Sequence, residues 1–280
     1  MIKPAAQDEA FLTALASPQP VGSLRLSWLG QSGFLVERDG RRMLFDPYLS
    51  DSLTQKYAST DKPHVRMTER VIAPERLADI DVVTSSHNHT DHLDAGTLRP
   101  LMAANPQMAF VIPVANLAFI GQRLGCDLSK AIGLDDGMSA EVAGFCFHGM
   151  ASAHNGLDRD AHGRHVYLGY IVECGPFTIY HSGDTLLYPG LVEKLGQFSI
   201  DIALLPINGN CPERRVSGNL DGREAAWLAK EIGARIVVPH HYEMFEFNTA
   251  DPRELFIPEC ERLRQPYQIL RAGETITFPA

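Results

Sequence analysis

Residues 85–94 read Ser-Ser-His-Asn-His-Thr-Asp-His-Leu-Asp and directly follow an apolar run at 80–84 that we expect to be a short strand. The stretch places three imidazoles and two carboxylates within eight residues. Inside a fold, so many polar groups need a partner that satisfies them together, and a bound cation would do so. Histidine is the commonest imidazole donor to transition metals, and aspartate adds a hard oxygen ligand. The stretch therefore predicts a metal site.

The spacing within this stretch indicates two ions rather than one. Side chains two residues apart in extended backbone point the same way, so His87 and His89 can converge on one ion. A turn then brings Asp91 and His92, at the start of the next helix, to face a second ion.

Further polar groups stand just after apolar runs elsewhere in the chain. These are His154 after the run 141–148, Asp184 after 178–180, and His240 and His241 after 236–238. Ligands of open α/β sheets gather at the carboxyl ends of strands. Four strand ends that supply His and Asp favour a site for two metal ions.

The rest of the pattern predicts an α/β fold. Short β-prone runs at 24–28, 33–37 and 42–45 indicate an antiparallel meander, and strand–helix–strand units follow at 80–112 and 202–238. We expect two mixed β-sheets packed together with helices outside, in a single domain over residues 1–280. Residues 1–20 form an N-terminal helical extension, with a helix from Glu9 to Ala16. Asp221 and Glu224 form a capping box, which predicts a helix start.

Composition narrows the class of protein. The net charge of −9 disfavours non-specific binding to nucleic acid or to anionic membranes. The apolar runs are far shorter than the roughly 20 residues of a membrane helix, and residues 1–20 lack a secretory signal. Five cysteines with no C-x-x-C spacing, and none beside a His at zinc-finger spacing, argue against a disulfide framework or a thiolate metal site and predict free thiols. We expect a cytoplasmic protein with no nucleic-acid or membrane partner, and leave homo-oligomer formation open.

The order H-x-H-x-D-H, a later His, a Ser-Gly-Asp turn and a final His resembles the metallo-β-lactamase superfamily. That resemblance implies an αββα four-layer sandwich, with helices on both outer faces. Segments 46–50, 61–67, 151–154 and 239–245 are more narrowly similar to the L-ascorbate-6-phosphate lactonase branch. The likeness runs over about residues 22–250, which is most of the chain.

The resemblance also implies a role for each donor. His87, His89 and His154 would hold the first ion, Asp91, His92 and His241 the second, and Asp184 would bridge the two. Asp91 would also be catalytic, since it would hold the nucleophile or relay its proton. His241 is preferred over His240 because the family's ligand directly precedes an aromatic residue. The resemblance implies two divalent metal ions, manganese or zinc, and the donor set suits both.

Supporting roles are predicted for other residues, each with an alternative. Asp46, His181 and His240 are expected to hydrogen-bond or orient metal ligands, although Asp46 could be a turn residue before Pro47 and His181 an ordinary strand-end residue. Substrate contacts are expected from Lys62, His64, Arg66 and Asn208. The first three would clamp an anionic group or belong to a solvated loop, and Asn208 would line the pocket or sit in an ordinary turn.

The expected function is a metal-dependent hydrolase that opens a small sugar-acid lactone, with or without a phosphate group. Its partner would be an anionic small-molecule substrate, and metal-activated water would be the nucleophile. One alternative is a metal-dependent phosphodiesterase, although the acidic chain argues against a nuclease. A second is a non-enzymatic metal-binding module, against which the presence of all seven donors argues.

Overall fold

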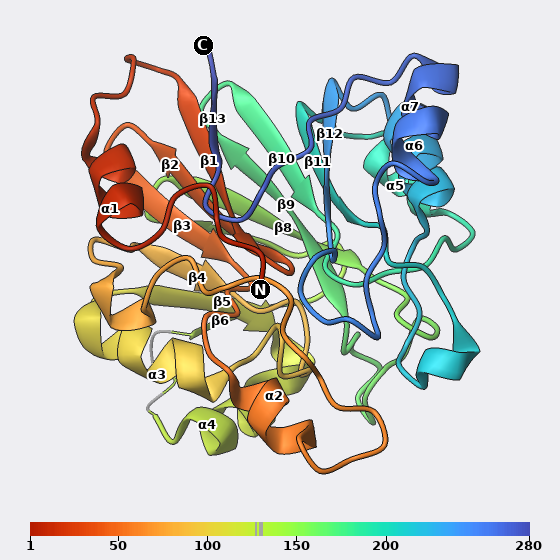
Figure 1. Cartoon of the computed structure of the whole chain (residues 1–280). Helices are drawn as coiled ribbons and strands as arrows, with labels where there is room; N and C mark the ends of the chain where they lie inside the picture. Colours follow the sequence, from red (N-terminus) through yellow and green to blue (C-terminus); the bar gives the residue numbers. More distant parts are fainter. Residues whose placement is uncertain (127, 129–130) are drawn as a thin grey trace.

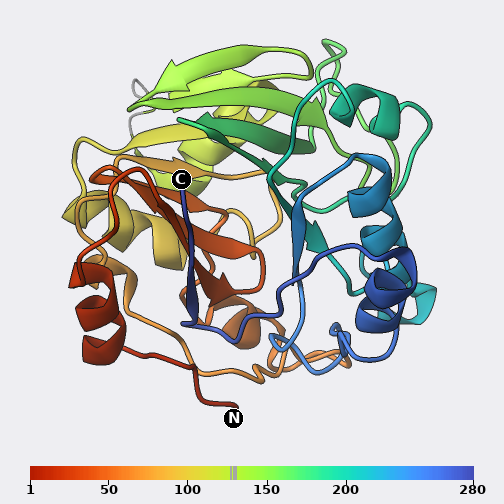
Figure 2. The same cartoon turned by 90° about the horizontal axis from the view of Figure 1, so that it is seen from above.

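The computed structural model describes residues 1–126, 128 and 131–280. Two mixed β-sheets face each other and helices cover the outer side of each, as Figures 1 and 2 show. This arrangement confirms the predicted α/β four-layer sandwich.

The first sheet has seven strands in the order β13-β1-β2-β3-β4-β5-β6. Its strands are β1 (Leu24–Gly30), β2 (Gly33–Arg38), β3 (Arg41–Phe45), β4 (Val82–Thr84), β5 (Ala109–Pro113), β6 (Ala131–Leu134) and β13 (Thr275–Phe278). The predicted meander forms the antiparallel part, while β3 to β6 pair in parallel.

The second sheet has six strands in the order β12-β11-β10-β9-β8-β7. Its strands are β7 (Ser139–Val142), β8 (Phe145–Ala151), β9 (Leu168–Cys174), β10 (Phe177–His181), β11 (Ile202–Pro206) and β12 (Ile236–His240). Strands β10, β11 and β12 are parallel, so their carboxyl ends lie at one edge of the sheet.

Helices flank both sheets. Those on the side of the first sheet are α1 (Glu9–Ala16), α3 (Ala95–Ala104) and α4 (Leu117–Leu124), while α2 (Ser52–Tyr57) lies at the edge of the sheets. Those on the side of the second are α5 (Leu191–Leu195), α6 (Gly222–Glu231) and α7 (Phe256–Leu263). Short 3-10 turns cover Pro74–Arg76, Val114–Asn116 and Pro212–Arg214. In the described ranges, no helix has the length and apolar character needed to cross a bilayer.

The space between the sheets is filled by apolar side chains. Phe45 from β3 stacks on His181 from β10, with ring centroids 4.7 Å apart, so aromatic contact joins the two sheets beside the predicted site. Side chains also cap two helices at their N-termini. Asp221 and Glu224 form the predicted capping box of α6, and Asp94 caps α3 by accepting a hydrogen bond from the backbone N–H of Gly96.

Candidate metal centre

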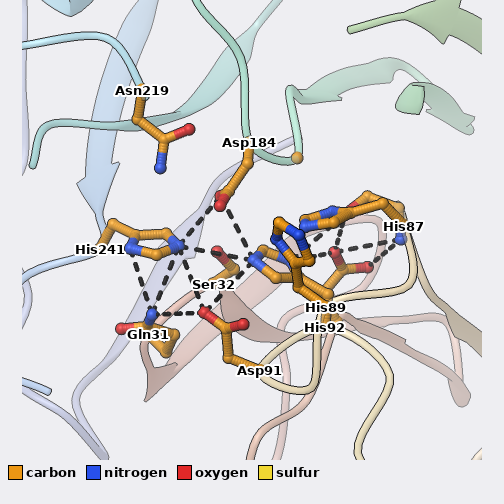
Figure 3. Close-up of polar contacts among 12 residues, drawn as sticks. Gln31, Ser32, His87, His89, Asp91, His92, Asp184, Asn219 and His241 are labelled. Atoms are coloured by element: carbon orange, nitrogen blue, oxygen red, sulfur yellow. Dashed lines mark hydrogen bonds and ion pairs between the residues drawn. The ribbon is translucent and has the colours of Figure 1, made fainter. Parts of the chain in front are cut away.

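The predicted donors converge from both sheets onto one place at the carboxyl ends of their strands (Figure 3). The 85–94 stretch forms the loop after β4 in the first sheet. The second sheet contributes His154 after β8, Asp184 after β10 and His241 after β12. Because these loops follow buried strands, their first residues are held at the edge where the sheets meet.

The first donor group consists of His87, His89 and His154, whose ligand atoms all lie within 4.8 Å of one another. Nδ1 of His89 is 3.2 Å from Nε2 of His154. Nδ1 of His154 donates to the carbonyl of Gly218 at 2.9 Å, which leaves its Nε2 lone pair facing the group. Nε2 of buried His87 has no hydrogen-bond partner among the described residues. A cation here would satisfy that orphaned nitrogen.

The second donor group consists of Asp91, His92 and His241, with ligand atoms again within 4.8 Å of one another. Oδ2 of Asp91 is 3.6 Å from Nε2 of His92 and 3.8 Å from Nε2 of His241. The two imidazole nitrogens are 3.5 Å apart. This spacing suits donors around a common ion better than direct hydrogen bonds.

Asp184 lies between the two groups (Figure 3). Its Oδ1 is 3.0 Å from Nε2 of His241 and 3.3 Å from Nε2 of His92, and its Oδ2 is 3.4 Å from Nε2 of His154. Each carboxylate oxygen therefore faces one group. Although buried, Oδ1 has no geometrically sound hydrogen bond within the described part of the chain. The residues present thus fit two cations that share this carboxylate.

The charges of the centre also suit cations. Burial raises the pKa of Asp184, but His241, His92 and His154 outweigh burial and hold it well below its usual range. Burial lowers the pKa of His154 to about 4 and that of His87 well below normal. Burial also disfavours a charged His92, yet Asp184 and Asp91 raise its pKa well above 6.5. The carboxylates thus favour positive charge at this place, which a bound cation would supply.

Asp46 holds one ring of the second group. It is fully buried, and its Oδ2 accepts from Nδ1 of His92 at 2.7 Å. Its carboxylate also accepts from Thr84 and from the hydroxyl and backbone N–H of Ser86. Burial alone would raise the pKa of Asp46, but the hydrogen bond and charge of His92 outweigh burial and lower the pKa below its usual value. The carboxylate therefore fixes the tautomer that turns Nε2 of His92 toward the site.

His181 and His240 lie behind the donors as a stacked pair, with ring centroids 5.1 Å apart. Nε2 of His181 donates to the carbonyl of Ser32, and its Nδ1 accepts from the N–H of Gly183 at 3.2 Å. That second bond holds the turn before Asp184. Nδ1 of His240 lies 3.1 Å from the hydroxyl of Ser32, outside both donor groups.

Comparison with known proteins places this architecture in a family. The sequence model of a family described as "Beta-lactamase superfamily domain" matches residues 25–241, from β1 to the last expected ligand. The chain belongs to the metallo-β-lactamase superfamily. A relative from Caldivirga maquilingensis, named "UPF0173 metal-dependent hydrolase", is 30% identical over 257 residues that cover 91% of this chain and 98% of the relative. A relative of the same name from Methanosarcina mazei is 26% identical over 275 residues, with 91% and 99% covered.

Solved structures of the superfamily share the fold. The metallo hydrolase Igni18 from Ignicoccus hospitalis KIN4/I is 25% identical, with a TM-score of 0.67 and coverage of 92% of this chain and 99% of that one. An isothiocyanate hydrolase from Delia radicum gut bacteria has a TM-score of 0.72 at 22% identity, with coverage of 91% and 99%. The second likeness bears on the fold alone.

A cavity of about 320 Å³ lies next to the two metal-donor groups and Asp184. Asp91, His89, His154, Asp184 and His241 form part of its lining. The lining also includes aromatic side chains and three cationic ones. These residues are Tyr57, His64, Phe245 and Phe247, together with Lys56, Arg123 and Arg215. The size of the cavity suits a small molecule.

The structure corrects the expected anion clamp, because neither Lys62 nor Arg66 lines this cavity. The side chain of Arg66 is 8% exposed, and it donates to Asp51 at 2.7 Å and to the carbonyl of Ser50. Nζ of Lys62 donates to the carbonyl of Glu213. These contacts tie loops together and leave neither cation directed at the metal donors.

His64 does line the cavity, but as part of its aromatic wall. Its ring stacks on Tyr57 at 4.2 Å and lies edge-on to Phe247 at 4.5 Å. Burial lowers the pKa of His64, so the ring is neutral near pH 7 and attracts anions weakly. His64 therefore lies at the cavity as predicted, but as an aromatic wall residue and not as a cation that binds an anionic group.

Asn208 contacts the cavity through a neighbour. Its side chain donates to Asn248 at 3.0 Å and accepts from Nδ2 of Asn219 at 3.0 Å. Asn219 lines the cavity, and its amide points toward the donors (Figure 3). Asn208 therefore orients a pocket residue, and Asn219 was not anticipated from the sequence.

Gln31 is a second residue that the sequence reading missed. Its Nε2 donates to Oδ2 of Asp91 at 2.8 Å and lies 3.2 Å from Nδ1 of His241. The one feature of the sequence that could have pointed to Gln31 is its place in the turn between Gly30 and Gly33, which joins β1 to β2. A polar residue in a glycine-flanked turn is too common to single out without its distant neighbours.

Proposed function

We propose that this chain is a metal-dependent hydrolase acting on a small anionic substrate. One observation carries the proposal. The Asp184 carboxylate lies between a group of three histidines and a group of one aspartate and two histidines, and it lines a cavity of about 320 Å³. The superfamily relatives named metal-dependent hydrolases support the same reaction class.

Two divalent ions, manganese or zinc, would be held by the two groups, with Asp184 shared between them. Such ions supply an activated water and polarise the attacked oxygen. The first ion would take His87, His89 and His154, and the second would take Asp91, His92 and His241.

The protein's own groups would position the reaction. Asp91, 17% exposed and oriented by Gln31, would hold the attacking group and take up its proton. Asp46 would keep Nε2 of His92 turned toward the site. Asn219 would accept a hydrogen bond from the substrate, since its Oδ1 is buried and has no hydrogen bond among the described residues.

For the substrate we favour a sugar-acid lactone. Similarity to the L-ascorbate-6-phosphate lactonase branch supports this class, and the wall of Tyr57, His64, Phe245 and Phe247 would pack against a flat ring. Lys56, Arg123 and Arg215 line the cavity and would attract its negative group despite the net charge of −9. Arg215 also pairs with Asp61, and Arg123 also donates to two backbone carbonyls of the loop after β4. The same cations also suit a phosphodiester, so a metal-dependent phosphodiesterase is the second candidate.

The free thiols of Cys174 and Cys260 support a reducing, cytoplasmic location. The proposed partner is a small-molecule substrate, with no nucleic acid or membrane.

The proposal is tested by a hydrolysis screen of the purified chain, with elemental analysis of its metals. The panel contains lactones, phosphodiesters and RNA. Asp184→Asn should keep the fold, by circular dichroism, and lose most activity because a neutral amide bridges cations poorly. Asp79→Asn is a matched control, since that carboxylate is 89% exposed at the surface.

Faster turnover of lactones would favour a lactonase, and faster turnover of phosphodiesters would favour a phosphodiesterase. Metal-loaded protein that turns over nothing in the panel would favour a non-enzymatic binding module. An Asp184→Asn variant with full metal content and full activity would remove the shared-carboxylate assignment.

A further inference from the structure

A second group of potential metal ligands lies on β8 and β9, away from the centre described above. Cys146 and His148 stand two residues apart on β8, so they share one face of the sheet. Phe145 and Phe147 alternate with them and are buried in the core, so the shared face is the outer one. Glu173 on β9 pairs directly with Cys146 across the two strands. Strand register thus brings a thiol, an imidazole and a carboxylate together.

The spacing of these three groups matches a tetrahedral metal site. Nε2 of His148 is 3.5 Å from Sγ of Cys146 and 3.3 Å from Oε2 of Glu173. All three ligand atoms lie within 4.8 Å of one another. A tetrahedral zinc ion with ordinary bond lengths would separate sulfur and nitrogen by about 3.6 Å, and nitrogen and oxygen by about 3.3 Å.

Nε2 of His148 can satisfy only one of its two neighbours at a time. Nε2 of His148 faces both Cys146 and Glu173, but one ring nitrogen either donates or accepts. If it donates to the carboxylate, it cannot accept from the thiol, whereas one cation would satisfy all three atoms.

The surroundings are also negatively charged. Glu141 on β7 pairs with Cys146 from the other side, which puts its carboxylate on the same face. Burial raises the pKa of the Cys146 thiol, and the charges of Glu173 and Glu141 raise it further. A bound cation would reverse that electrostatic penalty, because a ligating thiol is deprotonated by the metal.

We propose that Cys146, His148 and Glu173 form a separate binding site for a soft divalent transition-metal ion of the Zn²⁺ class. Thiolate and imidazole select such ions over hard ones such as Mg²⁺ or Ca²⁺. Glu141 or water completes the coordination. Cys146 lies five residues before Ala151, the end of β8 nearest the catalytic donors, or about 17 Å along the strand. The ion there clamps β8 to β9 and takes no part in hydrolysis.

Cobalt absorption tests the site, because a thiolate bound to Co²⁺ gives an intense near-ultraviolet charge-transfer band. The catalytic donors are imidazoles and carboxylates, so they do not produce this band. The full chain, stripped with a chelator, is titrated with Co²⁺ and should develop it. Cys146→Ser and His148→Ala should abolish the band, and Glu173→Gln should weaken Co²⁺ affinity at this site by at least about tenfold.

Cys211→Ser is the matched control, since Sγ of Cys211 lies 3.0 Å from a Glu213 oxygen in an otherwise similar thiol–carboxylate pair. It should retain the band and the Co²⁺ stoichiometry, whereas Cys146→Ser should bind one ion fewer per chain. All variants should keep the hydrolytic activity of the wild type, so a failed activity screen would not affect this result. A band that persists in Cys146→Ser, or no band in Co²⁺-saturated wild type, would mean a hydrogen-bonded cluster only.

Discussion

Among single residues, three at the metal centre have an unusual backbone conformation. Gln31, Asp46 and His241 have φ angles of 50°, 36° and 65°, in the left-handed region that L residues seldom adopt. Such conformations cost on the order of 1–3 kcal/mol each and persist where surrounding contacts enforce them. Here the enforcing contacts link the three residues to each other or to donors, so backbone strain and ligand position are coupled.

Asp46→Asn tests how much the buried carboxylate contributes to metal binding. Asparagine keeps the size and tolerates positive φ, but its neutral amide accepts more weakly from Nδ1 of His92. We expect metal affinity to fall by roughly 10–100-fold, as for other outer partners of ligating histidines. Competition with a chromophoric chelator measures this metal affinity. Asp79→Asn, also at positive φ but exposed, should leave affinity unchanged. Equal affinity in wild type and Asp46→Asn would contradict this role.

The two adjacent histidines should behave differently. His241 faces Asp184 at 3.0 Å, so His241→Ala should lose about one metal ion per chain. His240 packs on His181 and is fully buried, so His240→Ala should keep its metals and lower the thermal midpoint through the cavity it leaves. Elemental analysis and thermal unfolding measure both. Metal loss in the His240 variant alone would reverse the assignment.

At the scale of elements, the turn from β6 to β7 is fastened by one carboxylate. Asp136 accepts from the backbone N–H of Ala151 at the end of β8 and from Nζ of Lys194 on α5. Burial raises its pKa, but the Lys194 and Ala151 hydrogen bonds outweigh burial and lower it. The turn, β8 and α5 are therefore held together by a charge that disappears in acid.

The sign of the resulting pH dependence follows from the lowered pKa. Asp136 stabilises the fold above its unfolded pKa near 3.9, and this contribution is lost as pH falls through the lower folded value. Since Lys194 is 41% exposed, solvent screening limits the contribution to about 0.5–1 kcal/mol. Asp136→Asn should be less stable by that amount at neutral pH. Urea unfolding should show the difference shrinking as pH falls toward about 3, and a constant difference would refute the linkage.

Across the whole molecule, the metal centre joins the two sheets. The loop after β4 comes from the first sheet, while the donors after β8, β10 and β12 come from the second. Among the described residues, Nε2 of buried His87 and Oδ1 of buried Asp184 have no hydrogen-bond partner, and a cation would satisfy both. A bound ion should therefore stabilise the packing of one sheet on the other.

Removing the metals should lower the thermal midpoint. An ion at a hundred times its dissociation constant adds about 2.7 kcal/mol to the free energy of unfolding. For a chain of this size that corresponds to a shift on the order of 5 °C per ion. Calorimetry with and without chelator measures the shift, and re-addition of metal should restore it. Asp184→Asn should show a smaller shift. A midpoint insensitive to chelator would argue against cations that bridge the sheets.

Much of the fold and centre was predictable because the signals are local. The capping box of α6 depends on residues three apart, and the two strand–helix–strand units on periodicity within short windows. The donors stand immediately after apolar strands, so their meeting at one sheet edge follows from how parallel strands end. The sequence thus determined the sandwich and which His and Asp side chains converge.

The tertiary structure alone decided how the other polar residues are used. Arg66 was a plausible anion clamp by composition, but its partners Ser50 and Met244 bury it between loops. Gln31 meets Asp91 across 60 residues of chain, and Cys146 meets Glu173 only through the register of β8 and β9. A polar side chain's role depends on which groups desolvate it and hydrogen-bond to it. Those groups come from distant segments, so their identity depends on packing that no local sequence window contains.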